Sequence, residues 1–247
     1  MTAQLRSELL KQRSTRSSRG LLAAMVGLVA FVALLHGFGL PTENFGRRSA
    51  QLELLFGRGE MLGALFAGLL GAMSITAEFR HGTIRPTLLV TPRRGRVVAA
   101  KVWASLLFGA AFGVIAAAVA ASVGSVALAA RGVAIQLDAG DYMLLLAGGA
   151  AAAALWAAIG VGLGAMIRSQ VPTLVGLCAW VLFVEGLLAG DLGVIGDIGR
   201  FAPGALGAAA SGQDPQLAPL LGALLLALYA AAATVAGGAA TKRRDVA

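Results

Sequence analysis

The sequence contains little that could carry enzymatic or metal chemistry. In 247 residues it has one Cys, Cys178, and two His, His36 and His81. One Cys excludes an intramolecular disulfide, and two His with one Cys make no convincing metal site. The sequence also lacks the Gly-x-Ser-x-Gly and His-Glu-x-x-His motifs of hydrolases and the Gly-x-x-x-x-Gly-Lys-Ser/Thr loop that cradles nucleotide phosphates. We therefore expect no catalytic residue, metal or cofactor on this chain, so that any nucleotide would bind another polypeptide.

Charged residues are scarce too, and this scarcity indicates the class of protein. They make up 13% of the chain, against 58% hydrophobic residues, whereas soluble domains have about 25% charged residues. A helix needs about 20 apolar residues to cross a bilayer. Six stretches meet this requirement, at about 21–40, 60–77, 102–130, 142–167, 171–190 and 216–240. The sequence therefore predicts an all-α integral membrane protein with six transmembrane helices.

The basic residues are distributed unevenly between the two sides that six spans define. Fifteen of the 20 Lys and Arg fall on the side of the two termini, whereas the connections on the other side collect most of the acids. By the positive-inside rule both termini are cytoplasmic. We predict a multi-pass protein of the cell (inner or plasma) membrane, and the Arg-, Ala- and Gly-rich composition favours a bacterial source. Nucleic acid is not an expected partner, because the basic residues flank spans.

The chain divides into an N-terminal segment, a membrane domain and a short tail. Residues 1–19 alternate leucines with basic residues, which predicts a short interfacial helix at the inner membrane face. Its apolar face is narrow, so a solvated basic tail is the alternative. Residues 20–240 form the predicted six-span domain, with a cytoplasmic loop at 78–101 and an outer loop at 191–215. Residues 241–247 form a cytoplasmic tail.

Two features inside the spans are candidates for a specific role. Gly160 and Gly164 lie four residues apart, so helix backbones can approach closely there, although ordinary packing within one subunit gives the same pattern. Glu185 lies about fifteen residues into the fifth apolar stretch, in its outer half. An intramembrane acid is a functional candidate by default. The alternative is that Glu185 anchors the outer helix end or hydrogen-bonds a neighbouring span.

The most specific pattern lies in the connection between the second and third spans. Gly82 allows a sharp turn after the second span, and Thr83 can cap a new short helix. Ile84 and Leu88 would share one face of that helix, and the positive charge of the segment places it to meet something in the cytoplasm. A loop that is basic only to hold the topology is the alternative. The residues of this segment are Glu78, Phe79, Arg80, His81, Gly82, Thr83, Ile84, Arg85, Pro86, Thr87, Leu88 and Leu89.

This connection is also the most specific part of a resemblance that covers nearly the whole chain. The sequence resembles the permease subunits of type 2 ATP-binding-cassette (ABC) exporters in four segments, residues 7–17, 78–101, 160–168 and 200–204. The resemblance implies a half-transporter of six spans, a second permease half that is the same or a homologous chain, and a separate ABC ATPase subunit that binds ATP and Mg²⁺. It makes residues 1–19 the elbow helix and 78–89 the coupling helix that docks in a cleft on the ATPase. In that docking, Ile84 and Leu88 would fill the cleft while Arg80 and Arg85 pair with acids on its rim. The resemblance also places short re-entrant helices in the outer loop between spans five and six.

The function that the resemblance implies is export driven by ATP hydrolysis on the partner chain. The apolar lining expected of the pathway favours a hydrophobic or amphipathic substrate, such as a drug-like natural product, a peptide or a lipid. The alternative is a six-span protein of the lipid bilayer that works without ATP, either a secondary transporter or a structural membrane component. A neighbouring reading frame for an ABC ATPase would distinguish the two, because only the exporter needs one.

Overall fold

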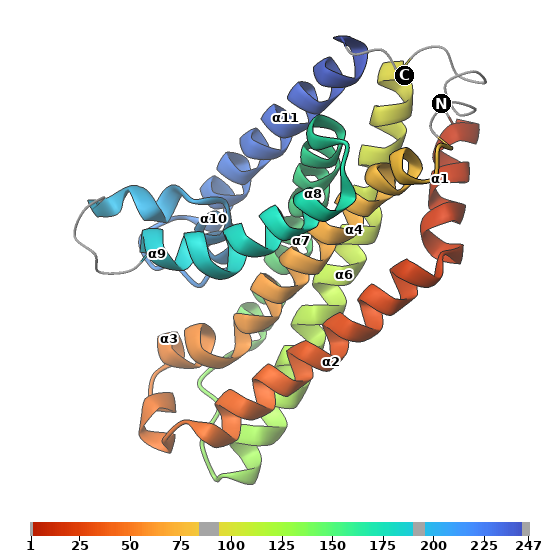
Figure 1. Ribbon diagram of the computed structural model, residues 1–247. Helices are drawn as coiled ribbons and strands as arrows, with labels where there is room; N and C mark the ends of the chain where they lie inside the picture. Colours follow the sequence, from red (N-terminus) through yellow and green to blue (C-terminus); the bar gives the residue numbers. More distant parts are fainter. Residues whose placement is uncertain (1, 84–93, 190–195, 244–247) are drawn as a thin grey trace.

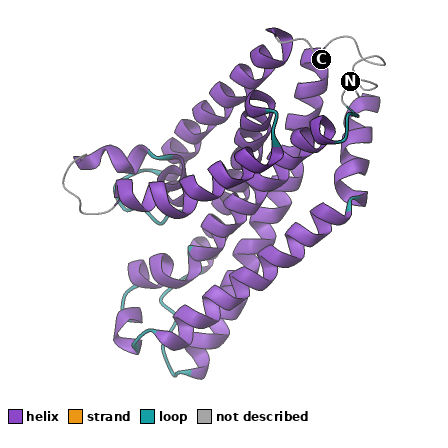
Figure 2. Ribbon diagram, in the orientation of Figure 1, coloured by secondary structure: helices purple, strands orange, loops and turns teal. Residues whose placement is uncertain are grey.

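The computed structural model describes residues 2–83, 94–189 and 196–243, and these ranges contain helices and loops but no strand (Figure 2). Six helical stretches are long and apolar enough to cross a membrane, which confirms the predicted six-helix, all-α class. They are Arg16–Gly39, Arg48–Arg80, Gly95–Ala130, Ala139–Ile167, Gln170–Leu188 and Pro219–Thr241.

Several of these stretches contain more than one helical element. The elements, in chain order, are α1 (Thr2–Ser14), α2 (Arg16–Gly39), the 3₁₀ turn η1 (Thr42–Phe45), α3 (Arg48–Gln51), the π-helical η2 (Leu52–Phe56), α4 (Arg58–Arg80), α6 (Arg94–Ala130), α7 (Ala139–Ile167), α8 (Gln170–Ala179), the π-helical η3 (Trp180–Val184), α9 (Glu185–Ala189), the 3₁₀ turn η4 (Gly196–Phe201), α10 (Pro203–Ala210) and α11 (Pro219–Arg243). One π-helical stretch is separated from α4 by Gly57 and the other lies directly before α9, and such stretches are frequent at functional sites.

Helices α4 and α7 form the centre of the bundle, with the other long helices around them (Figure 1). In the apolar windows of these two spans, 72% and 61% of the residues are buried, whereas only 17–22% are buried in those of α2, α8 and α11. Large apolar side chains such as Phe31, Val171 and Leu228 are correspondingly exposed. This distribution is the one expected when lipid covers the peripheral helices.

Small residues allow α4 and α7 to approach closely. A Cβ added at Gly160 of α7 would collide with the carbonyl oxygen of Gly68 on α4. One turn later, a Cβ at Gly164 would lie 2.8 Å from Ile75 Cγ2 and 3.0 Å from the Ala72 carbonyl oxygen. The predicted packing glycines thus face the central helix of the same chain, where backbone contact takes the place of side-chain contact.

The helices on either side of the second connection are longer than the predicted spans. Helix α4 continues to Arg80, and α6 begins at Arg94, eight residues before the predicted start of the third span. Residues Val97, Val98 and Lys101 of this extension are buried, so packing against neighbouring helices stabilises the extra turns. The N-terminal segment is divided as well, because Thr15 has an extended backbone between α1 and α2.

Polar contacts between loops and helix ends hold the bundle end farthest from α1. Gln51 is fully buried and its amide nitrogen donates to the carbonyl oxygens of Phe45 (2.8 Å) and Ala134 (2.9 Å). Arg48 Nε donates to Asp141 Oδ2 at 2.8 Å, joining α3 to the start of α7. These contacts satisfy groups that the loops would otherwise bury without partners.

Candidate functional site

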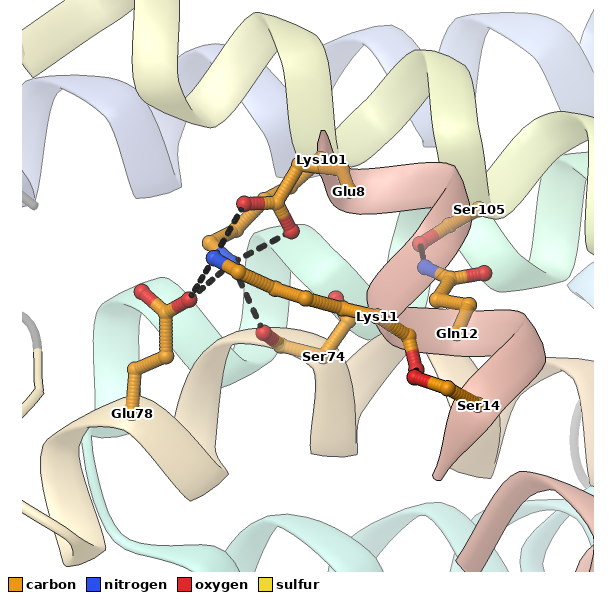
Figure 3. Close-up of polar contacts among 8 residues, drawn as sticks. All are labelled: Glu8, Lys11, Gln12, Ser14, Ser74, Glu78, Lys101 and Ser105. Atoms are coloured by element: carbon orange, nitrogen blue, oxygen red, sulfur yellow. Dashed lines mark hydrogen bonds and ion pairs between the residues drawn. The ribbon is translucent and has the colours of Figure 1, made fainter. Parts of the chain in front are cut away.

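Four charged side chains from three helices meet where α4 ends and α6 begins (Figure 3). Lys101 of α6 is fully buried, and its Nζ donates to Glu8 Oε2 and Glu78 Oε1, both at 2.8 Å, and to the Ser74 carbonyl oxygen at 3.0 Å. Lys11 Nζ donates to Glu8 Oε1 at 2.7 Å and to Glu78 Oε1 at 2.8 Å. We call Glu8, Lys11, Glu78 and Lys101 the junction network; its two acids balance its two lysines.

The network satisfies a fully buried lysine, which is costly to bury unless it is paired. An ammonium has three donors, and all three of those on Lys101 are used. Burial alone would raise the pKa of Glu8, but Lys101 and Lys11 outweigh it and hold this pKa below the usual carboxyl value. Burial likewise opposes the charge on Lys11, but the hydrogen bonds to Glu78 and Glu8 raise its pKa above the usual lysine value. Glu8 and Lys11 therefore stay charged at neutral pH.

Helix α1 uses a polar face to pack against the bundle. Lys11 and Gln12 lie three and four residues after Glu8, about one helical turn, so both lie on the same side of α1 as Glu8. Gln12 is buried and its amide nitrogen donates to Ser105 Oγ of α6 at 2.9 Å. The face that anchors α1 is thus polar, which explains why the apolar pattern of this segment is narrow. A solvated tail, the alternative weighed from the sequence, does not fit this packing.

A cavity of about 490 Å³ lies beside the junction network, between α4 and the bend that joins α1 to α2. Its wall combines network residues with hydroxyl and apolar side chains, among them Thr15, Ser18, Leu21, Leu70, Met73 and Ser74. The cavity leaves free volume beside α1 at the point where the chain bends at Thr15.

The predicted docking segment starts inside α4. Glu78 is buried and belongs to the junction network, so its carboxylate faces the bundle interior instead of a docking surface. Phe79 and Arg80 are the last residues of α4, and Arg80 is exposed with Nη1 3.2 Å from Gln170 Oε1. His81 follows the helix end. Ile84, Arg85, Pro86, Thr87, Leu88 and Leu89 lie outside the described residues.

Gly82 makes the turn that the sequence predicts after the second span. Its φ of +67° lies in the left-handed region, which favours glycine. The exposed Thr83 follows and ends the described part of this connection. A segment of ten residues, 84–93, therefore separates the described end of the α4 connection from the start of α6.

Arg168 forms a second junction at the same end of the bundle. It is the one residue other than glycine with a positive φ in the described part of the chain, and it ends α7. Its Nη2 donates to the Ala240 carbonyl oxygen of α11 at 3.0 Å, and its guanidinium lies 5.5 Å from the centre of the Phe79 ring. Arg168 thus connects α7 with α11 and with the last turn of α4.

Glu185, the intramembrane candidate, occupies the opposite half of the bundle. It begins α9 directly after the π-helical η3. Its Oε1 accepts from Trp180 Nε1 at 2.6 Å and from the backbone N–H of Gly204 at 2.9 Å. Gly204 lies in the first turn of α10, where a negative charge is favourable because the first N–H groups of a helix have no partner within it. Glu185 thus hydrogen-bonds the short helix α10, which is not one of the six spans.

Sequence reasoning missed most of the charged groups that the fold brings together. It counted Lys11 and Lys101 as topology signals and as parts of the segments that carry the resemblance, but paired neither with an acid. It took Glu60 as the edge of a span, yet Glu60 is buried and lines a cavity. One available signal was that Glu8 and Glu78 are acids on the side where basic residues gather. No protein-family model matches this sequence, and no curated protein is significantly similar to it.

Proposed function

We propose that this chain is the membrane-spanning permease subunit of a type 2 ABC exporter. It forms half of a translocation pathway and couples ATP hydrolysis on a separate ATPase subunit to the export of a hydrophobic or amphipathic substrate. The six apolar helices fit a half-transporter, and the motif at residues 78–94 is the sequence feature on which the family assignment rests. Both termini would be cytoplasmic, and the predicted docking segment, residues 78–89, would meet the ATPase there.

The observation that carries this proposal is the position of the junction network relative to that segment. Glu78 is the first residue of the segment and Lys101 lies twelve residues after its last, and their side chains hydrogen-bond directly at 2.8 Å. Lys11 and Glu8 add α1 to the same cluster. A displacement of segment 78–89 would therefore reach α4, α6 and α1 together.

A displacement of the docking segment couples ATP hydrolysis to transport only if the docked ATPase interacts differently with two arrangements of the helices. In the proposed cycle, ATP binding closes the ATPase dimer and moves both docked segments, and the two permease halves then rearrange so that substrate leaves toward the outside. The cavity beside Thr15 and Leu21 gives α1 room to shift while the charged cluster holds it to the ends of α4 and α6. The junction network would transmit the movement as one rigid unit.

Co-purification with the ABC ATPase encoded by a neighbouring reading frame tests this proposal. We expect a stable complex in detergent and a change in the rate of ATP hydrolysis. The paired variant Arg80→Glu, Arg85→Glu should remove that change while the chain still inserts in the membrane, because the variant repels the acids expected on the ATPase. Arg6→Glu, Arg13→Glu is a matched control that reverses two exposed charges on α1. If the Arg80→Glu, Arg85→Glu variant still stimulated ATP hydrolysis as the wild type does, the docking assignment would be refuted.

Gly82→Pro tests the same coupling through the backbone. Proline fixes φ near −65°, which is incompatible with the φ of +67° at Gly82. The variant should insert normally but lose most of the stimulation of ATP hydrolysis. Gly27→Ala, on the α2 face where a Cβ meets nothing within 4 Å, is the control.

A secondary transporter without an ATPase is the second candidate. Buried ionisable groups within spans are typical of ion-coupled transport, and Glu60 is such a group. This candidate predicts that no ATPase co-purifies and that a proton gradient alone drives substrate movement in vesicles. Substrate movement that requires ATP and the ATPase would exclude it.

A further inference from the structure

A second cavity, of about 510 Å³, lies in the half of the bundle away from the junction network. It lies among α4, α7, the π-helical η3 and the short helices α9 and α10. Its apolar wall includes Met61, Ala64, Val181 and Leu182, and its volume is within the range of pockets for small organic molecules. Its charged lining is uneven, with the three acids Glu53, Glu60 and Glu185 and one base, Arg58.

The two inner carboxylates face the same short helix one turn apart. A Cβ added at Gly204 of α10 would collide with Glu185 Oε2, and a Cβ at Gly207 would lie 2.5 Å from Glu60 Oε1. Residues three apart on a helix are neighbours on one face, about 5–6 Å from each other. Glu60 and Glu185 therefore converge on one small region of the cavity wall.

Two deeply buried polar groups in this cavity lack partners within the described ranges. Glu60 is 3% exposed and its Oε1 has no partner within hydrogen-bond distance there, although the amide of Gln213, itself unpaired, is its polar neighbour. Trp156 is 2% exposed and its indole N–H donates to no described residue. Neither Glu60 nor Glu185 forms an ion pair with any described Lys, Arg or His. Buried acceptors and donors are normally satisfied, so unpaired ones facing a cavity indicate that a ligand supplies the missing contacts.

We propose that this cavity binds an amphipathic organic cation, such as a protonated amine or a quaternary onium group on an apolar body. The positive group would lie between Glu60 and Glu185, and the apolar body would pack on Met61, Val181 and the ring of Trp156. An indole face also attracts cations. Arg58 is half-buried at the same wall, and the three carboxyl groups outnumber it. A metal ion is a poorer fit, because the described residues contain no group of three metal-ligating side chains.

This inference deepens the proposed function, because it names the class of cargo, and its role in transport rests on that function. The binding itself requires no ATPase. It can therefore be measured on the purified chain alone in lipid nanodiscs, with tetraphenylphosphonium as the probe. Tetraphenylborate has nearly the same size and shape but the opposite charge, so it serves as the control ligand.

We expect saturable binding of tetraphenylphosphonium to the wild-type chain, weakened at least about tenfold in Glu60→Gln and in Glu185→Gln. Glu43→Gln, which removes an exposed acid of η1 outside the cavity, is the matched control and should bind like the wild type. Any binding of tetraphenylborate should be the same in the wild type, in Glu60→Gln and in Glu185→Gln. If Glu60→Gln does not fold, Gly207→Ala tests the same carboxylate, because the added methyl displaces it.

Equal binding by the wild type and both glutamine variants would overturn the proposal, as would binding of both probes with the same dependence on the two acids. Failure of the two proposals can be told apart. If the chain binds the cation but recruits no ATPase, the binding proposal stands and the exporter proposal fails. If the chain stimulates its ATPase but does not bind the cation, the exporter proposal stands and organic cations are excluded as its cargo.

Discussion

The carboxylates near the two ends of α4 have opposite surroundings. Glu78 shares two lysines with Glu8, whereas Glu60, eighteen residues earlier on the same helix and about 27 Å away, has no described ion-pair partner. A buried acid with matched lysines fixes helices to one another, because separating the partners leaves charges unpaired. A buried acid without them remains open to a ligand. The contrast assigns a mechanical role to one end of α4 and a binding role to the other.

Removing the central lysine of the junction network should have the largest effect. Lys101→Met keeps the length of the side chain but leaves Glu8 and Glu78 with Lys11 alone, so we expect the free energy of unfolding to fall by about 3–5 kcal/mol. Thermal unfolding in detergent measures this loss. Arg96→Met removes an exposed cation from the same helix and should have almost no effect. A Lys101→Met chain as stable as the wild type would show that the network does not hold the helices together.

The contact between α4 and α7 lies between the two ends of α4. A change there should have the next largest effect on the free energy of unfolding. In Gly160→Ala the new methyl meets the Gly68 carbonyl oxygen, a backbone atom that cannot rotate away. We expect a loss of about 3 kcal/mol, the upper part of the range for overpacking. Gly176→Ala on α8 is the control, because a Cβ there meets nothing within 4 Å. If Gly160→Ala were as stable as Gly176→Ala, the close contact of α4 with α7 would not contribute to a rigid connection between the two ends of α4.

The pH dependence of the junction network can be tested with Glu8→Gln, which should lower the free energy of unfolding by about 2 kcal/mol at neutral pH. The folded-state pKa of Glu8 is depressed, so its contribution is fully present above the ordinary value of 4.5 and is lost as the pH falls through the folded-state pKa. The pKa of Lys11 is raised, so its contribution is present below 10.5 and is lost only as the pH rises through that raised pKa.

The stability gap between the wild type and Glu8→Gln should thus be constant between about pH 5 and 10 and should narrow in acid. Unfolding curves at several pH values measure it. Glu43→Gln, which changes an exposed acid outside the network, should show no comparable gap. A gap that widened as the pH fell below 4.5 would have the wrong sign for a salt-bridged Glu8 and would contradict the assigned network.

The sequence predicts the helices well because the bilayer imposes a simple rule on them. A run of about 20 apolar residues identifies a span without knowledge of its neighbours. The rule fails at the ends, where α6 begins at Arg94 and α4 continues to Arg80. There Val97 and Lys101 are buried by packing against other helices, and hydropathy along the chain contains no information about that packing.

The candidate sites were harder to predict because their members are distant in the sequence. Glu8 and Lys101 are 93 residues apart, and only the packing of α1 on α6 brings them together. Taken singly, Lys101 resembles any basic residue beside a span, and Glu60 resembles a polar span boundary. Glu185 was recognisable because it interrupts an apolar run, and Gly82 because a turn has a local signature. Local signals predict single residues, whereas the pairing of charges depends on the fold.

The smallest effect is expected at Trp180, whose indole N–H donates to Glu185. Trp180→Phe keeps most of the ring and removes this bond, but the Gly204 N–H still holds the carboxylate, so the free energy of unfolding should fall by only about 1 kcal/mol. Trp103→Phe is a control for ring size, because Trp103 is exposed and has no hydrogen bond through its side chain in the described part of the chain. A loss as large as that of Lys101→Met would make Glu185 a structural anchor and remove the difference between the two ends of α4. A small loss, combined with weaker cation binding in Glu185→Gln, would sharpen that difference, because the same carboxylate would then matter more for a ligand than for the fold.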